Sequence, residues 1–150
     1  MWIYLQIINE IRMNYTNILD QNIYDPGFKD QFLVIGSCLT KIHPEIVKQF
    51  AKEWGSVYTF CLEQFHYNQM MAKLYSILAV ANPKRVGFLT VDGSPHCIQM
   101  HFGSKYLKRG LKNSEIQYEH YVIDEQGKVA QVTMEAIDKA KRISLLGKPL

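Results

Sequence analysis

The chain has 150 residues, of which 47% are hydrophobic and 21% are charged, and its 17 basic and 14 acidic side chains give a formal net charge of +3. This composition excludes a disordered chain, a collagen-like chain and a disulfide-dense scaffold. A chain of this length can bury about two thirds of the surface that its unfolded form exposes. We therefore expect residues 1–150 to form a single domain.

The distribution of charge and hydropathy argues against nucleic acids and membranes as partners. The nearest approach to a basic patch has helical spacing, which indicates a solvated helix face. Its members are Lys105, Lys108, Arg109 and Lys112. No stretch approaches the roughly 20 apolar residues of a membrane span. The apolar segment 1–11 lacks the basic region and the cleavage site of a signal peptide, so we expect a cytoplasmic protein.

The first 27 residues are predicted to form a helical extension. Apolar residues between Ile3 and Leu19 recur at approximately helical spacing, which predicts a helix over this range. The turn sequence Tyr24-Asp25-Pro26-Gly27 then ends the extension.

From residue 31 onward, predicted strands alternate with predicted helices. The expected strands are 32–36, 57–60, 85–91 and 118–123. The expected helices are 44–54, 65–80, 95–110 and 132–146, with a polar turn at 124–128. Continuous apolar runs of this length are typical of parallel strands that are buried on both faces. The pattern therefore predicts an α/β fold, a single three-layer domain with a mainly parallel, flavodoxin-like sheet and an extra N-terminal helix.

The three cysteines, Cys38, Cys61 and Cys97, each follow one of the first three predicted strands. The carboxyl ends of parallel strands lie at one edge of a sheet, and adjacent strands are about 4.8 Å apart. If the first strand lies between the second and the third, the three loops converge, and we expect the cysteines to be metal ligands. The alternative is that they are core residues, because free cysteine often packs as a small apolar side chain.

The loop after the third predicted strand is the densest in chemically useful groups. Asp92 and Gly93 favour a tight turn, and Ser94-Pro95 is a typical helix start with serine as the N-cap. Cys97 then lies in the first turn of the helix, where the helix dipole favours a thiolate.

Two histidines lie close to this cysteine in the sequence. If the site is an enzyme's, we predict Cys97 and the adjoining His96 as its catalytic residues, although His43 or His66 could instead pair with Cys97. His101 lies one helical turn beyond Cys97, so the two could share a metal. The alternative for His101 is ordinary packing on the helix surface.

A second loop, Gly36-Ser37-Cys38, follows the first predicted strand. A glycine and a small hydroxyl residue at this position are typical of loops that present backbone N–H groups to an anion. The glycine spacing is that of neither a dinucleotide-binding fingerprint nor a P-loop. If the cysteines only pack, we expect a small-ligand or phosphate site built from Gly36, Ser37, Asp92, Gly93 and Ser94.

The cysteine-containing loops resemble those of the iron–sulfur small subunits of nickel–iron hydrogenases. The matching segments are Gly36-Ser37-Cys38 and Gly93-Ser94-Pro95-His96-Cys97, with Cys61 as a third position. The resemblance implies a flavodoxin-like domain with a cluster at the carboxyl edge of its sheet. The CxxC pair and the Gly-Cys-Pro-Pro motif of that family are absent, and a four-iron cluster would need His96, another side chain or an external ligand in place of a fourth cysteine.

These observations predict a redox or metal-binding domain, as part of an oxidoreductase, with an iron–sulfur cluster or zinc as its cofactor. The partner would be a redox protein or a small molecule, and the sequence leaves open whether the chain forms a homo-oligomer. Besides the small-ligand alternative, the chain could be an accessory subunit that docks a partner. Exposure of Phe65 and Tyr67, in the loop after Cys61, would favour docking.

Overall fold

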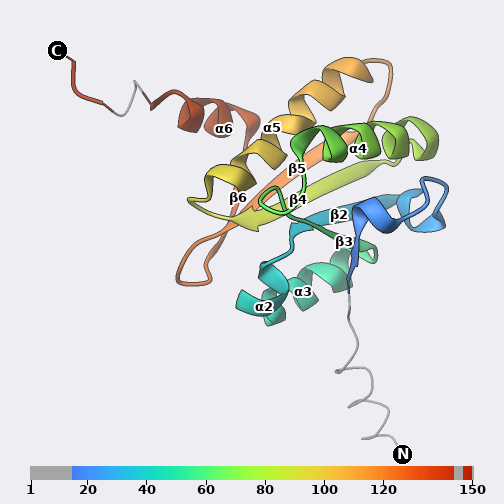
Figure 1. Ribbon diagram of the computed structural model, residues 1–150, viewed down its shortest axis with the longest axis horizontal. Coiled ribbons are helices and arrows are strands. Elements are labelled where there is room, and N and C mark those ends of the chain that lie inside the picture. The colour runs from blue at the N-terminus through green and yellow to red at the C-terminus, as the bar shows by residue number, and fades with distance from the viewer. Residues whose placement is uncertain (1–14, 144–146, 150) are drawn as a thin grey trace, which may run out of the picture.

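A six-stranded sheet runs through the middle of the molecule, in the order β1-β3-β2-β4-β5-β6 (Figure 1). The computed structural model describes residues 15–143 and 147–149. The strands are β1 Thr16–Asn17, β2 Gln31–Gly36, β3 Val57–Phe60, β4 Arg85–Val91, β5 Gln117–Ile123 and β6 Val129–Val132. Neighbouring strands from β1 to β5 are parallel, and β6 is antiparallel to β5.

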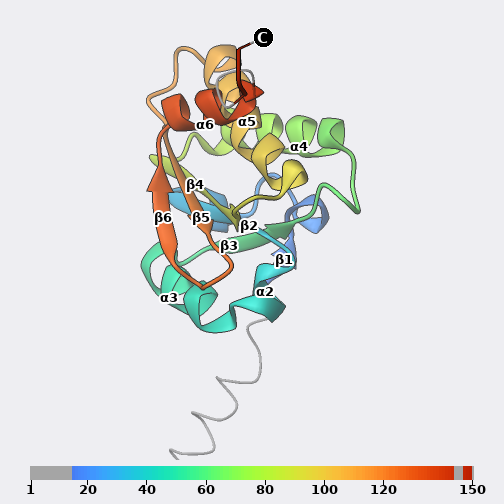
Figure 2. The same ribbon diagram turned by 90° about the vertical axis from the view of Figure 1, so that its left-hand side faces the viewer.

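Helices cover both faces of the sheet, so the domain has three layers (Figures 1 and 2). One face carries α2 Leu39–Ile42 and α3 Pro44–Trp54. The other carries α4 Tyr67–Ala81, α5 Pro95–Gly110 and α6 Met134–Lys141. Two short 3₁₀ helices, η1 Ile18–Asp20 and η2 Pro26–Phe28, precede β2. Among the described residues, no helix has the length and hydrophobicity needed to cross a membrane.

Strand β2 is buried on both faces, as its continuous apolar sequence predicts. Phe32 and Val34 point to the core beneath α4 and α5, whereas Leu33 and Ile35 point to the core beneath α3. Because successive side chains of a strand alternate between faces, the single run Phe-Leu-Val-Ile supplies both cores. The sheet is therefore fixed between its two helical layers by burial of its central strand.

The four predicted strands and their parallel arrangement are confirmed. The first predicted strand, β2, lies between the second, β3, and the third, β4, which is the order that the convergence of the cysteine loops requires. The predicted helices that begin at Pro44 and Pro95 are also confirmed, as α3 and α5.

The ends of two other helices differ from the prediction for local reasons. Helix α4 begins at Tyr67 rather than at residue 65, because the Gln69 side chain accepts a hydrogen bond from the His66 N–H (2.9 Å) and caps the helix there. The last helix was predicted over 132–146, but 129–132 form strand β6, and Thr133 caps α6 through a hydrogen bond from the Ala136 N–H (3.2 Å). Residues 144–146 lie outside the described residues.

The predicted N-terminal helix over 3–19 is wrong at its described end. Residues 3–14 of it lie outside the described residues. After them, the chain forms β1 and then η1, where the Asn17 side chain accepts a hydrogen bond from the Leu19 N–H (2.9 Å). Asparagine that bonds to the backbone two residues on favours a cap or a turn over a helix interior, which is the reason for the error.

Candidate functional site

The loops that carry the three cysteines leave the sheet at the same edge. Gly36 and Phe60 are register partners at the ends of β2 and β3, and the Ser37 N–H donates to the Phe60 carbonyl over 3.1 Å. Cys61 therefore follows directly after one member of this pair, and Cys38 lies two residues after the other. Strand β4 runs parallel to β2 on its other side, so the loop that leads to Cys97 begins at this edge too.

The thiols of the three loops lie within electrostatic reach of one another. The pKa of Cys38 is raised above its ordinary value, first by partial burial, then by the negative charge of Cys97 and next by that of Cys61. The carboxylate of Glu63 adds a smaller effect in the same direction. Cys38 is exposed, and Cys61 and Cys97 are half-buried. The structure thus brings all three predicted ligands to one edge of the sheet.

An ion pair joins two of these loops. His96 Nδ1, in the first turn of α5, lies 3.4 Å from Glu63 Oε1, in the loop after β3. Both side chains are largely exposed, so solvent screens the pair and its contribution to stability is small. The contact matters for the site because it places an imidazole and a carboxylate beside the cysteines.

The start of α5 is built as the sequence predicts. The Ser94 Oγ accepts a hydrogen bond from the Cys97 N–H (3.3 Å), and Pro95 is the first helical residue. Gly93 has a φ of +79°, which favours glycine, and its N–H donates to Asp92 Oδ1 (3.0 Å). Cys97 is therefore the third residue of the helix.

The structure brings together only some of the residues that the sequence predicts for a small-ligand or phosphate site. The segment from Asp92 to Pro95 lines a cavity of ≈ 830 Å³ between α5, α6 and the end of β4. Gly36 and Ser37 are not among the residues that line this cavity. Gly36 is buried at the end of β2, and the Ser37 carbonyl accepts the Thr40 hydroxyl (2.9 Å).

The side chains at the cysteine edge do not form a ready set of metal ligands. Across 15–143 and 147–149, no group of three or more histidine, cysteine or acidic side chains is arranged so that it could hold a metal ion. Phe65 and Tyr67, whose exposure would favour docking of a partner, are both half-buried. Phe65 packs on Phe60, with ring centroids 5.8 Å apart.

His101 faces the core and belongs to a buried polar chain that sequence reasoning missed. Its Nε2 lies 2.8 Å from Thr90 Oγ1, and its Nδ1 lies 2.9 Å from Nδ1 of His120. Ser104 Oγ donates to the His101 carbonyl (2.7 Å) and lies 3.3 Å from His120 Nε2. All four side chains are at most 4% exposed. The one signal in the sequence is a histidine in the middle of the predicted strand 118–123.

The hydrogen bond that Ser104 donates sets the direction of the other hydrogen bonds among these four side chains. Because the Ser104 hydroxyl donates to the His101 carbonyl, it accepts from Nε2–H of His120. His120 Nδ1 then carries no proton and accepts from Nδ1–H of His101. His101 Nε2 is left as an acceptor for the Thr90 hydroxyl. These directions are those of two neutral rings.

Burial keeps the two histidines in this neutral form. It lowers the pKa of His101 to about 3, with a further contribution from His120, and it lowers the pKa of His120 to about 4. The ring of Phe88 stacks on that of His120, at 5.7 Å and 11°. An apolar ring face stabilises a neutral imidazole without supplying a counter-charge. These hydrogen-bonded side chains therefore link α5 to β4 and β5 at neutral pH.

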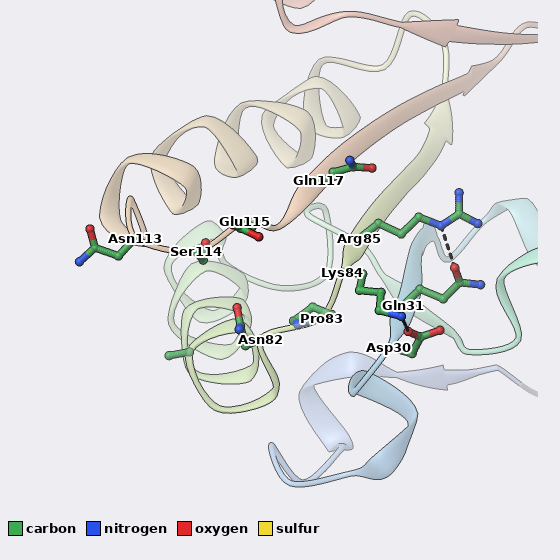
Figure 3. Close-up of a pocket in the computed structure, with 11 residues that line it drawn as sticks. Asp30, Gln31, Asn82, Pro83, Lys84, Arg85, Asn113, Ser114, Glu115 and Gln117 are labelled. Carbon is green, nitrogen blue, oxygen red and sulfur yellow. Dashed lines mark hydrogen bonds and ion pairs between the residues drawn. The ribbon is translucent and has the colours of Figure 1, made fainter.

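A polar cavity lies at the opposite, amino edge of the sheet (Figure 3). Its volume is ≈ 940 Å³, and its walls include Gln31, Arg85 and Gln117, the first residues of three strands. Arg85 Nε donates to Gln31 Oε1 (2.7 Å), and its guanidinium contacts Glu119 (3.2 Å) and stacks on Trp54 (4.0 Å). Arg85 is thus engaged in joining the strand starts, and no predicted site residue lines this cavity.

The histidine pair makes the fold sensitive to acid. Both folded-state pKa values lie below the ordinary 6.5, so the unfolded chain binds protons that the folded chain does not as pH falls below about 6.5. At pH 5 we expect a loss of ~2 kcal/mol of unfolding free energy per histidine relative to pH 7.5, because each protonates only on unfolding. Urea denaturation at the two pH values measures the loss. His120→Gln should reduce it by ~2 kcal/mol.

His43→Gln is the matched control, since His43 lies outside the buried chain of Thr90, His101, Ser104 and His120. The His43→Gln variant should lose as much unfolding free energy between pH 7.5 and pH 5 as the wild-type protein does. An equal loss in wild type and His120→Gln would contradict the assignment of neutral, buried rings.

The convergence of the thiols predicts the effect of removing one of them. In Cys97→Ser, the pH profile of iodoacetamide labelling at Cys38 should shift to lower pH, because the largest charge that raises the Cys38 pKa is gone. Cys61→Ser should shift it less. Peptide-resolved mass spectrometry gives both profiles. Profiles that match wild type in both variants would place the three thiols out of reach of one another.

Comparison with models of protein families matches residues 25–147 to a Rossmann-like domain. Neither the curated proteins nor the solved structures contain a match. The family match spans the sheet and its helices, from the turn before η2 to the end of α6 and beyond, and so includes all three cysteine loops. The chain therefore belongs to the family of Rossmann-like domains.

Proposed function

We propose that the carboxyl edge of the sheet is a thiolate site that binds zinc or an iron–sulfur cluster. The observation that carries the proposal is that the parallel order β3-β2-β4 sends the loops of Cys38, Cys61 and Cys97 to one edge, where the charges of Cys97 and Cys61 act on Cys38. The chain has only these three cysteines, and all lie at this edge. Packing alone does not require that arrangement.

The chemistry of the available donors supports such a metal. Thiolates and imidazoles are the ligands that zinc prefers, and thiolates hold iron–sulfur clusters. Cys38, Cys61 and Cys97 would be the three sulfur ligands, and His96, which adjoins Cys97 and contacts Glu63 of the loop after β3, is a candidate for the fourth position. The resemblance of the loops at Cys38 and Cys97 to those of hydrogenase small subunits favours a cluster. The central order β3-β2-β4, with β2 flanked on both sides, supports a flavodoxin-like arrangement.

Binding would require the loops to move towards one another. No ligand group is ready among the described residues, so the thiols must close on the metal and Cys38 must lose its proton. Its raised pKa opposes that loss in the metal-free protein, and a bound cation would reverse the effect. The metal-bound protein should therefore resist unfolding better than the metal-free one. In a reducing cytoplasm the thiols stay available, and a redox partner protein would exchange electrons at this edge only if the bound group were a cluster, because zinc has no redox chemistry.

A second candidate function rests on the cavity beside this edge. The segment from Asp92 to Pro95 forms part of its wall, and Thr90 and His101 lie at its base. A volume of ≈ 830 Å³ is in the range of small-molecule sites. Under this alternative, the cysteines pack and the cavity binds a small, largely apolar ligand.

A measurement of metal binding distinguishes between the two candidate functions. Protein purified without oxygen and reconstituted with zinc, or with iron and sulfide, should hold one zinc ion or one cluster per chain after gel filtration. Cys38→Ser, Cys61→Ser and Cys97→Ser should each weaken zinc binding at least tenfold, because a thiolate ligand is lost. Metal analysis and isothermal titration calorimetry provide the measurements.

Thr40→Ala is a matched control in the same loop as Cys38. It removes a hydroxyl that donates to the Ser37 carbonyl but no ligand atom, so metal content should stay at the wild-type level. Wild-type protein that retains neither zinc nor iron would contradict the thiolate site and leave the small-ligand function as the better one.

A further inference from the structure

A third cavity lies along the carboxyl-terminal half of α5, whereas Cys97 lies in the first turn of that helix. Its volume is ≈ 880 Å³, and its lining residues come from the carboxyl-terminal half of α5, from β5, and from the end of β6 where α6 begins. Ser104 and His120, one end of the buried polar chain, form part of its wall. Neither the three cysteines nor Asp92, Gly93 and Ser94 line it.

Basic side chains from α5 and the turn after it line this cavity. They are Lys105, Lys108, Arg109 and Lys112. Lys105 is neutralised by Asp138, with Nζ–Oδ distances of 2.8 and 2.9 Å. The other three have no acidic partner within the described part of the chain.

The one carboxylate on the cavity wall, Glu119, is already engaged. It contacts the guanidinium of Arg85 (3.2 Å) and accepts a hydrogen bond from the Tyr121 hydroxyl (2.7 Å). Glu135, in the first turn of α6, pairs with Lys139 (2.9 Å). The cavity therefore keeps an uncompensated positive charge.

The position of this charge in the fold favours an anion. Cations at the carboxyl end of α5 interact favourably with the helix dipole, which allows Lys108 and Arg109 to lie together without acidic partners. The amino end of α6 reaches the same cavity through Thr133 and Met134, and that end carries positive partial charge. A concave site with walls of one sign focuses the potential more than a convex helix face does.

We propose that this cavity binds a phosphorylated small molecule. Lys108, Arg109 and Lys112 would contact the phosphate, since a guanidinium fork and two ammonium groups match a dianion with several acceptor oxygens. Ile116 and Val132 provide apolar wall for the rest of the ligand. The volume is in the range of small-molecule sites. A nucleic acid would require a longer basic surface than these residues offer.

Titration with inorganic pyrophosphate tests the charge that the proposal uses. Isothermal titration calorimetry of the full chain at low ionic strength should show one site. The variant Lys108→Ala/Arg109→Ala/Lys112→Ala should bind at least tenfold more weakly. The matched control Lys29→Ala/Lys41→Ala/Lys52→Ala removes the same charge from exposed positions outside this cavity and should bind as wild type does.

A second readout locates the ligand. In ¹H–¹⁵N spectra, pyrophosphate should shift the amides of 104–112, 116–120 and 131–134 and the ring nitrogens of His120, and leave those of His43 in place. Equal weakening in both triple variants would mean non-specific attraction and would overturn the proposal. So would no binding at millimolar pyrophosphate, shifts confined to other regions, or tighter binding of a single-stranded oligonucleotide than of pyrophosphate. None of these outcomes depends on metal at the cysteine edge.

Discussion

Burial of β2 on both faces is the constraint on which the rest of the structure depends. A strand whose side chains are apolar on both faces must be covered by helices above and below, and parallel partners on both sides complete its hydrogen bonds. Parallel connections return each chain segment to the same starting edge, so the loops after the parallel strands β1 to β5 leave at the opposite edge. The chemistry of Cys38, Cys61 and Cys97 is gathered at one edge for this reason.

The buried polar chain adds a second, directional element to that frame. Apolar packing between α5 and the sheet is non-directional, whereas the hydrogen bonds from Thr90 through His101 to His120 require one rotation and one depth of the helix. The chain also separates two cavities, because Thr90 and His101 line one and Ser104 and His120 line the other. A ligand in the first cavity would lie against Thr90 and His101, and a ligand in the second against Ser104 and His120.

The sequence was informative where local chemistry decides the structure. The apolar run of β2, the Ser94-Pro95 start of α5 and the cysteines after successive strands predicted the sheet, a helix and the edge where the thiols meet. Strand β6 was missed because it is largely exposed and its residues carry no alternation of buried and exposed positions. The pairing of His101 with His120 was missed because it joins a helix to a strand, and the cationic cavity because a helical row of basic residues looks the same whether it faces water or a concave wall.

The central claim is that the three cysteines form one thiolate site. X-ray absorption at the zinc edge of the zinc-loaded protein tests it most directly, since it reports the atoms bound to the metal. We expect three sulfur neighbours at about 2.3 Å and one nitrogen or oxygen at about 2.0 Å. A shell of nitrogen and oxygen alone would contradict it.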